Sequence, residues 1–326
     1  MIKIGVIGAG HLGKIHIKCI KEIKEYALIG FYDSNEDTKA IVASEFGIKS
    51  FDTMDELIKA VDVIDIITPT ISHFPVASAS IKQFKHIFIE KPLCSNLTEG
   101  KKLISLAGEA NVKVQVGHVE RFNPAFIAAK PYIKEPMFIE THRLAEFNPR
   151  GTDVPVVLDL MIHDIDILLN IVKANVKRVS ASGVSVISKT PDIANARIEF
   201  DNGCVANLTA SRISLKKMRK FRIFQPEAYI AIDFFKKKSE IINIEELKAN
   251  EKEGPFDIII NTAPEENRKR IKIFNPETNE INAIKMELES FYKAVKNDKD
   301  PEVSIQDSYK ALELAYKIIE KSNNKL

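Results

Sequence analysis

The sequence lacks the features that mark secreted, metal-binding and membrane-spanning proteins. Only three cysteines occur among its 326 residues, at Cys19, Cys94 and Cys204. They are too scattered and too few for a disulfide framework or a metal-binding pattern, so buried, reduced thiols are expected. No apolar run reaches the length that crosses a bilayer, and no secretory leader is visible. We therefore expect a cytoplasmic protein with no membrane partner.

An excess of charge of either sign is also missing. Lys and Arg number 47 and Asp and Glu 45, which gives a formal net charge of +2. A balance this close to neutral argues against nucleic acid or an anionic membrane as a partner. The basic stretch 216–220 has no interleaved aromatic residue, which favours a solvated loop between strands. The chain length predicts about two domains, each large enough to bury a core.

A glycine-rich loop at the N-terminus is the strongest motif present. The apolar run 2–7 leads into Gly8-Ala9-Gly10-His11-Leu12-Gly13, which opens the helix-like segment 12–24. A strand, this glycine pattern and a helix form the context of a dinucleotide-binding loop. Gly8 permits the tight turn, Gly10 lets the backbone approach a pyrophosphate, and Gly13 lets helix and strand pack closely. The helix start at His11 and Leu12 offers free N–H groups to the phosphates.

An acidic residue then selects the cofactor. Asp33 follows the second apolar run, 26–32, and is placed to accept hydrogen bonds from the adenosine ribose hydroxyls. The next residues, Ser34 and Asn35, include no arginine that would receive a 2′-phosphate. The sequence therefore predicts NAD rather than NADP. The alternative is a glycine-rich turn with an unrelated acid downstream.

Strand-like and helix-like segments alternate over residues 1–119, which predicts an α/β, doubly wound parallel sheet of the Rossmann type. Ligands of such sheets lie beyond the carboxyl ends of the strands. We therefore expect Thr68-Pro69-Thr70, His73 and Glu90-Lys91 to face the cofactor, although a solvent-exposed His73 is an alternative. About six strands are expected in this domain. Strand-like runs include 2–7, 26–32, 63–67, 86–89 and 112–116.

From residue 120 to 326 the pattern changes to a second, α+β domain. Alternating strand-like runs follow one another without helices between them, which predicts an open, mostly antiparallel sheet. Helices are expected at 157–172, 284–296 and 304–321, and the last helix can pack back on the first domain. The cleft between the domains is the default active site. We expect strands at 137–142, 176–185, 194–200, 204–212, 221–224 and 229–234, a turn at 236–238 and a polar loop at 263–270.

The candidate catalytic groups are a carboxylate, an imidazole and an ammonium. Asp159 and His163 stand four residues apart, so both project from one face of a regular helix. A carboxylate beside an imidazole fixes its tautomer and raises its basicity, as a general base requires. Lys91 at the sheet edge can stabilise a developing alkoxide. An ordinary loop lysine and a chance helix-surface pair are the alternatives. We expect no metal, because His163 has no second histidine at ligand spacing.

Together these motifs resemble the Gfo/Idh/MocA family of NAD(P)-dependent oxidoreductases along essentially the whole chain. The resemblance rests on the glycine loop, on Glu90-Lys91-Pro92 at the end of the fifth strand, and on Asp159 to His163. It implies a Rossmann domain with an open-faced α/β domain, a cis peptide before Pro92, and hydride transfer at a sugar carbon. It also implies that Lys91 and His163 are catalytic and that Asp159 helps to hold substrate and imidazole. One departure is Asp153-Val154-Pro155-Val156-Val157, where many members carry glycines.

Two stretches, 117–125 and 151–164, resemble members that oxidise C3 of UDP-N-acetylglucosamine. In those members the keto product usually passes to an aminotransferase. Arginines suit bidentate recognition of a diphosphate, although structural salt bridges are the alternative for each. Glu120 and Asn123 are candidates for sugar hydroxyls or for capping the next helix. The substrate-binding candidates are His118, Glu120, Arg121, Asn123, Arg143 and Arg150.

Other functions remain compatible with the sequence. The same fold can act on an inositol or other polyol, a UDP-N-acetylglucosaminuronate or a non-sugar carbonyl compound. A non-catalytic NAD-binding regulator has little need of Lys91, Asp159 and His163. A lyase or hydrolase that oxidises its substrate transiently would release no reduced cofactor. An open sheet face needs covering, so a homodimer or homotetramer is expected.

Overall fold

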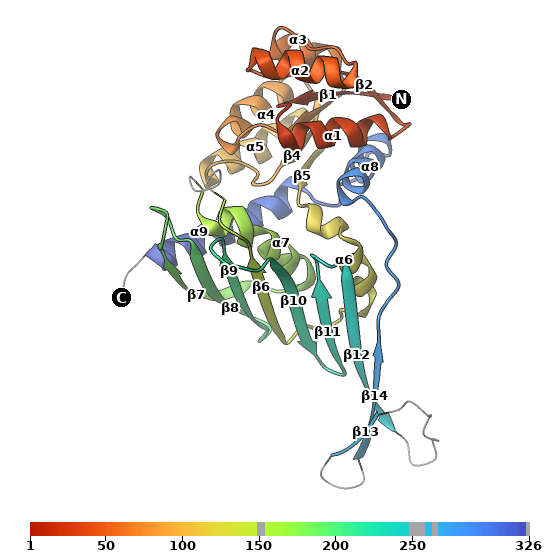
Figure 1. The fold of residues 1–326 in the computed structure, drawn as a ribbon, viewed down its shortest axis with the longest axis vertical. Coiled ribbons are helices and arrows are strands. Elements are labelled where there is room, and N and C mark those ends of the chain that lie inside the picture. The colour runs from red at the N-terminus through yellow and green to blue at the C-terminus, as the bar shows by residue number, and fades with distance from the viewer. Residues whose placement is uncertain (149–153, 248–257, 263–266, 324–326) are drawn as a thin grey trace. The chain divides into compact units, whose positions relative to one another are not determined.

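Two compact units make up the chain in the computed structural model, which describes residues 1–148, 154–247, 258–262 and 267–323 (Figure 1). The first unit joins residues 1–122 to residues 282–313. The second joins residues 123–281 to residues 314–326. Residues 282–313 therefore belong with the N-terminal unit, although the second unit's sheet precedes them in the chain.

The first unit contains a parallel sheet in the order β2-β1-β3-β4-β5. This confirms the doubly wound fold, but the sheet has five strands rather than six. After the last strand the chain enters a short 3-10 helix, Val119–Phe122, and Asn123 then caps a helix, so no sixth strand forms. Glu90-Lys91-Pro92 consequently follows the fourth strand, not the fifth. The strands are β1 Ile2–Ile7, β2 Tyr26–Tyr32, β3 Val63–Ile66, β4 His86–Glu90 and β5 Val114–Gly117.

Helices pack on both faces of this sheet, as alternation along β1 shows. Ile4 and Val6 join a buried cluster with Ile17 and Phe291 of two helices on one side. Gly5, between them, faces Leu57 on the other side. Strands buried on both faces explain the continuous apolar runs in the sequence. The helices are α1 His11–Lys21, α2 Glu36–Phe46, α3 Met54–Ala60, η1 Thr70–Ser72, α4 His73–Ile81, α5 Leu97–Ala110, α8 Ala283–Lys296 and the first part of α9 Ile305–Asn323.

The second unit is built on a sheet in the order β13-β14-β12-β11-β10-β6-β9-β8-β7 (Figure 1). Among the described strands of this sheet, only β6 and β9 pair in parallel, which confirms the mostly antiparallel arrangement. Two expectations were wrong: the basic stretch enters a strand at Met218, and residues 267–270 begin a strand instead of a loop. The strands are β6 Phe138–Leu144, β7 Val176–Val184, β8 Ile193–Phe200, β9 Val205–Ser211, β10 Met218–Gln225, β11 Ala228–Asp233, β12 Lys238–Leu247, β13 Ile258–Thr262 and β14 Asn267–Phe274.

One face of this sheet is buried and the other is open. Along β6, Ile139, Thr141 and Arg143 are buried, whereas the alternate residues Glu140 and His142 remain partly exposed. Such alternation is typical of a sheet with one solvated face. The unit's helices are α6 Pro124–Ala129, the short η3 Lys130–Tyr132, a π-helical turn Val157–Met161, α7 Ile162–Ile171 and the end of α9. None of the described helices is both long and apolar enough to span a membrane.

Candidate active site

A pocket of about 720 Å³ opens at the carboxyl ends of the strands of the first unit. The position agrees with the rule that ligands of open parallel sheets lie beyond these strand ends. The glycine loop, the end of β2 and the segments after β3 and β4 all contribute to it. Its lining residues include Gly8, Gly10, His11, Leu12, Gly13, Asp33, Ser34, Thr68, Pro69, Ser72, Glu90 and Lys91.

The three glycines have different steric reasons to be glycine. Gly8 has a φ of +95°, and a Cβ there would lie 2.6 Å from the carbonyl oxygen of Ile67. A Cβ on Gly13 would collide with the carbonyl oxygen of Gly8. A Cβ on Gly10 would meet no protein atom within 4 Å, so its backbone faces open space. That space is suited to a pyrophosphate approaching the start of α1, and the loop therefore fits a dinucleotide.

Asp33 closes the other side of this loop. Its carboxylate accepts hydrogen bonds from the backbone N–H of Ala9 at 2.7 Å and from that of Asn35 at 2.9 Å. The acid therefore holds the glycine loop in place while it lines the pocket. Ser34 and Asn35 follow it, and neither supplies a positive charge for a 2′-phosphate. These contacts fit the adenosine side of NAD.

His73 has a supporting position that the sequence did not reveal. Its buried ring lies between two carbonyl oxygens, with Nδ1 2.8 Å from that of Pro92 and Nε2 2.9 Å from that of Thr68. Burial lowers the pKa of His73, against the hydrogen bonds to these carbonyls. The ring thus joins two loops at the pocket edge, and neither His73 nor Thr70 is among the pocket's lining residues. The predicted contact of His73 with the cofactor remains a prediction.

Glu90 and Lys91 bring charge to the end of β4. The backbone N–H of Lys91 donates to Glu90 Oε2 at 3.2 Å, and both residues line the pocket. The peptide between Lys91 and Pro92 is cis, as the family resemblance implied. The sequence thus located this loop, but the packing that supports Glu90 comes from residues it did not single out.

Asp159 and His163 lie in the second unit where a π-helical turn passes into α7. Both are partly exposed, whereas Leu158 and Ile162 beside them are buried. We predicted a regular helix over 157–172, which was wrong for the first turn. A π turn is wider than an α turn, so the four-residue spacing alone does not stack the two side chains. Such turns are frequent at functional sites. The residue pattern did not predict this one.

The substrate-binding candidates are mostly buried and engaged by the protein. Arg143 forms a buried, two-point ion pair with Asp164, at 3.0 and 2.8 Å. Arg121 Nη1 donates to the carbonyl oxygen of Glu302 at 3.1 Å, and Asn123 caps α6. His118 and Glu120 are also buried, and Arg150 lies outside the described residues. These contacts give Arg121, Asn123 and Arg143 structural roles; substrate contacts for the six residues remain predictions.

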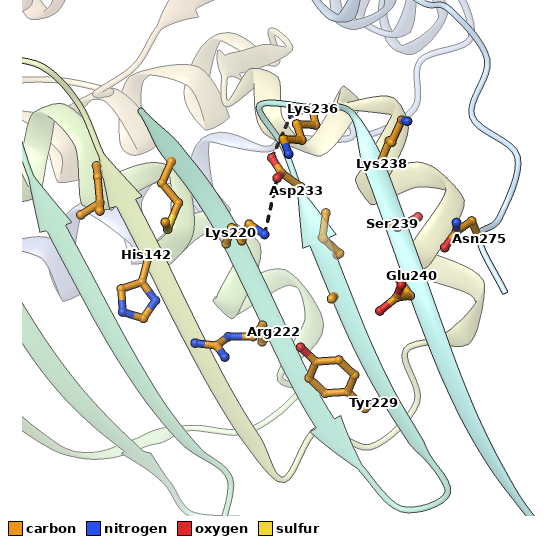
Figure 2. A pocket seen from close by; sticks show the side chains of 14 residues that line it. His142, Lys220, Arg222, Tyr229, Asp233, Lys236, Lys238, Ser239, Glu240 and Asn275 are labelled. Atoms are coloured by element: carbon orange, nitrogen blue, oxygen red, sulfur yellow. Dashed lines mark hydrogen bonds and ion pairs between the residues drawn. The ribbon is translucent and has the colours of Figure 1, made fainter. Parts of the chain in front are cut away.

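A second hollow, of about 650 Å³, lies on the open face of the nine-stranded sheet (Figure 2). Figure 2 shows Lys220 pointing toward Asp233, with Nζ 3.8 Å from Oδ2. Arg222 pairs with Glu140 at 2.8 Å. These two cations are therefore paired with acids on adjacent strands. Its lining residues are His142, Leu144, Met218, Lys220, Arg222, Tyr229, Ala231, Ile232, Asp233, Lys236, Lys238, Ser239, Glu240 and Asn275, none of them a predicted catalytic residue.

Two family models match the chain. Residues 2–118 match an oxidoreductase family with an NAD-binding Rossmann fold, and residues 140–230 match the GFO/IDH/MocA C-terminal domain. UDP-N-acetylglucosamine 3-dehydrogenase from Acidithiobacillus ferrooxidans is 37% identical over 238 residues, which cover 72% of this chain and 74% of the relative. Myo-inositol 2-dehydrogenase from Thermotoga maritima is 26% identical over 97% of this chain and 94% of its own length.

Solved structures agree with these matches. The structure of the Acidithiobacillus ferrooxidans UDP-N-acetylglucosamine 3-dehydrogenase superposes with a TM-score of 0.87 at 30% identity, over 98% of this chain and 97% of that one. A scyllo-inositol dehydrogenase from Lactobacillus casei, solved with NAD(H) and scyllo-inositol, gives a TM-score of 0.75 at 19% identity, over 99% and 96%. The second likeness shows a common fold only.

Proposed function

Because this chain belongs to the Gfo/Idh/MocA family of NAD-binding oxidoreductases, we propose that it oxidises C3 of a UDP-N-acetylhexosamine with NAD as the hydride acceptor. The observation that carries the substrate class is the 37% identity to a UDP-N-acetylglucosamine 3-dehydrogenase over 72% of the chain. The pocket lined by Lys91, together with the partly exposed Asp159 and His163, supplies groups that such a reaction needs.

In this proposal three side chains divide the proton chemistry. His163 accepts the proton of the C3 hydroxyl, and Asp159 fixes the tautomer of its imidazole. The ammonium of Lys91 stabilises the alkoxide that develops as the hydroxyl loses its proton. NAD, when bound, takes up the hydride. Asp33 and the glycine loop orient the cofactor, so that the reacting carbon and the ring are held in near contact.

The base assignment is tested by His163→Ala. We expect kcat to fall by about 100-fold or more, since a positioned base contributes that much. Binding of NADH, followed by its fluorescence, should stay unchanged. Asn170→Ala, a partly exposed position later on the same helix, is the matched control. Turnover in His163→Ala equal to that of the control would refute the role of His163.

The substrate is tested with a panel of nucleotide sugars, free inositols and other polyols. Formation of NADH is followed by absorbance and products by mass spectrometry, with an aminotransferase added to trap the 3-keto sugar. Activity with UDP-N-acetylglucosamine alone supports the proposal. Activity restricted to inositols would favour the second candidate, which the Thermotoga maritima relative suggests because it matches nearly the full chain. We also propose that an aminotransferase consumes the keto product in the cell.

We further propose that the protein forms a homodimer or homotetramer across the open face of the nine-stranded sheet. Phe224 is 39% exposed there and packs against Tyr229, with ring centroids 4.9 Å apart. Exposed apolar side chains within rows of paired charges are typical of a subunit interface. Light scattering should report more than one chain per particle, and Phe224→Lys should lower the mass. A monomeric wild-type protein would overturn this proposal.

A further inference from the structure

Four ionisable side chains meet in the core of the first unit, next to the nucleotide pocket. His16 comes from α1, Asp65 from β3, Glu90 from the end of β4 and Glu287 from α8. His16, Asp65 and Glu287 are each 0% exposed. Burying charged groups is costly unless they are paired. The question is therefore how the charges of this cluster are balanced in an apolar core.

His16 is the centre of the cluster. Its Nδ1 lies 3.0 Å from Asp65 Oδ2, and its Nε2 lies 3.3 Å from Glu90 Oε1. Nδ1 is hydrogen-bonded to Asp65, whereas Nε2 lies within ion-pair distance of Glu90 without a hydrogen bond, so a protonated imidazolium would place its charge between the two carboxylates. Burial alone would lower the pKa of His16, but the charges of Asp65 and Glu90 and the hydrogen bond to Asp65 raise it well above its ordinary value.

Glu287 is the member without a counter-charge. Neither of its oxygens has a hydrogen-bond partner among the described residues. Ligand atoms of His16, Glu90 and Glu287 nevertheless lie within 4.8 Å of one another. The single cation of the cluster is shared by Asp65 and Glu90 already. A negative charge on Glu287 would add a third carboxylate to one imidazolium, on a side chain that has no exposed surface.

We propose that Glu287 is held as a neutral carboxylic acid, and that His16 and Glu287 together are positioning residues that fix Glu90, and through it Lys91, at the edge of the nucleotide pocket. The connection is direct, because Glu90 Oε1 faces His16 while Oε2 accepts the backbone N–H of Lys91. Gly117 on β5 leaves room for this arrangement, since a Cβ there would lie 2.7 Å from Glu90 Oε1. The proposal rests on the NAD-binding role of the pocket and not on the identity of the sugar.

The charges around Glu287 predict how it titrates. Burial raises its pKa well above the ordinary 4.5, the negative charges of Glu90 and Asp65 add to this, and His16 opposes it. In the unfolded chain the carboxyl ionises near its ordinary value. The stability contributed by its proton is therefore complete below about pH 4.5 and is lost as the pH rises through the folded-state value. Tyr26, buried in the same core, donates its hydroxyl to the carbonyl oxygen of Leu288, and burial together with the charge of Asp65 raises its pKa.

Glu287→Gln tests the proton, because glutamine has nearly the shape of the neutral acid and does not ionise. Its melting temperature should exceed that of the wild type by a margin that grows by about 3 °C per pH unit above about pH 5. Glu289→Gln on the same helix, at a partly exposed position, is the control and should show no such trend. A pH-independent difference, or a loss of stability in Glu287→Gln at every pH, would overturn the proposal.

The link to the pocket is tested with the double variant His16→Gln and Asp65→Asn, which replaces the fully buried ion pair by two amides and leaves the partly exposed Glu90 without its cation. We expect NADH, followed by fluorescence, to bind about tenfold more weakly, while unfolding remains cooperative. An NADH affinity within twofold of the wild type would contradict the positioning role. Metal analysis is the last measurement. A divalent metal bound one per chain, and absent from Glu287→Gln, would show that a cation rather than a proton balances the cluster. Turnover of any sugar enters none of these readouts.

Discussion

The two units differ in how their most deeply buried charges are arranged. In the second unit, the buried arginines have matching acids: Arg143 pairs with Asp164 through two contacts, and Arg212 pairs with Asp192. In the first unit, three carboxyl groups surround the single imidazole of His16. A matched pair satisfies its own charge and stabilises a surface between elements. A buried carboxyl group without a cation, such as Glu287, has to hold a proton instead. Glu287 also lies next to Glu90, which lines the nucleotide pocket.

The difference follows from the kinds of sheet. Parallel strands end together at one edge, so Asp65 on β3 and Glu90 on β4 are brought to neighbouring strands near the pocket. In the antiparallel sheet, charged residues on the open face pair across strands, as Arg222 does with Glu140. The predicted catalytic residues of the second unit, Asp159 and His163, come from helical turns and not from the sheet. The residues at the ends of parallel strands can therefore be predicted from the order of strands and helices in the sequence. The surroundings of a helix residue depend on how the helix packs, which the sequence does not show directly.

The largest expected effect on cofactor binding is in the glycine loop. In Gly13→Ala, the new methyl group collides with the carbonyl oxygen of Gly8, so the loop and α1 must separate. We expect NADH binding to weaken by about 100-fold or more, since the loop then no longer presents its N–H groups to the phosphates. Fluorescence titration measures this. Gly108→Ala is the control, because a Cβ at that helical glycine meets nothing within 4 Å. Equal NADH affinity in the two variants would show that the loop tolerates the methyl group.

The sequence predicted the first unit in more detail than the second. The glycine spacing and Asp33 located the pocket, because their roles depend on backbone geometry that local sequence encodes. The strands of the second unit were predicted up to residue 234, but β12 and β14 were missed because charged residues interrupt them. The π turn before α7 has no residue signature.

Contacts between distant segments were the hardest to predict. Glu287 is far from Glu90 in the sequence. It reaches the cluster only because α8 packs against the N-terminal elements of the first unit. Arg143 has the chemistry of a phosphate ligand, yet its partner Asp164 lies on a helix whose contact with β6 no local pattern specifies. For this reason the sequence listed Arg143 as a substrate contact, and it gave no role to His16 or Asp65.

The second expected effect tests whether the matched pairs of the second unit are structural. Arg143→Met leaves Asp164 buried without its partner, and we expect a loss of about 3–5 kcal/mol in unfolding free energy. The double change to Arg143→Met and Asp164→Leu removes both charges and should recover most of that loss. Urea denaturation measures each value. Lys14→Met, which breaks a partly exposed ion pair with Glu45, is the control and should cost less than about 1 kcal/mol. If the double variant is as unstable as Arg143→Met, the loss does not come from an unpaired buried charge, and the two side chains stabilise the fold through other interactions.

The smallest expected effect separates the two units by the sign of their pH dependence. The Asp192 carboxylate accepts backbone N–H bonds from Val186, Ile187 and Ser188 and an ion pair from Arg212. Burial alone would raise its pKa, but the hydrogen bonds to the 186–188 backbone outweigh burial and lower the pKa far below the ordinary 3.8. The stability from this carboxylate is therefore present above about pH 3.8 and is lost as the pH falls toward the folded-state value.

Asp192→Asn keeps the size of the side chain and removes the charge. We expect it to cost about 2 kcal/mol of unfolding free energy at pH 7, and the gap to the wild type to shrink when urea denaturation is repeated at pH 3. Glu287→Gln, in contrast, should gain on the wild type as the pH rises. A paired carboxylate and a protonated carboxyl group thus give slopes of opposite sign, and these two variants measure them at different ends of the pH range. If the stability difference from the wild type changed with pH in the same direction in both variants, the distinction between a paired carboxylate in the second unit and a protonated carboxyl group in the first would be wrong.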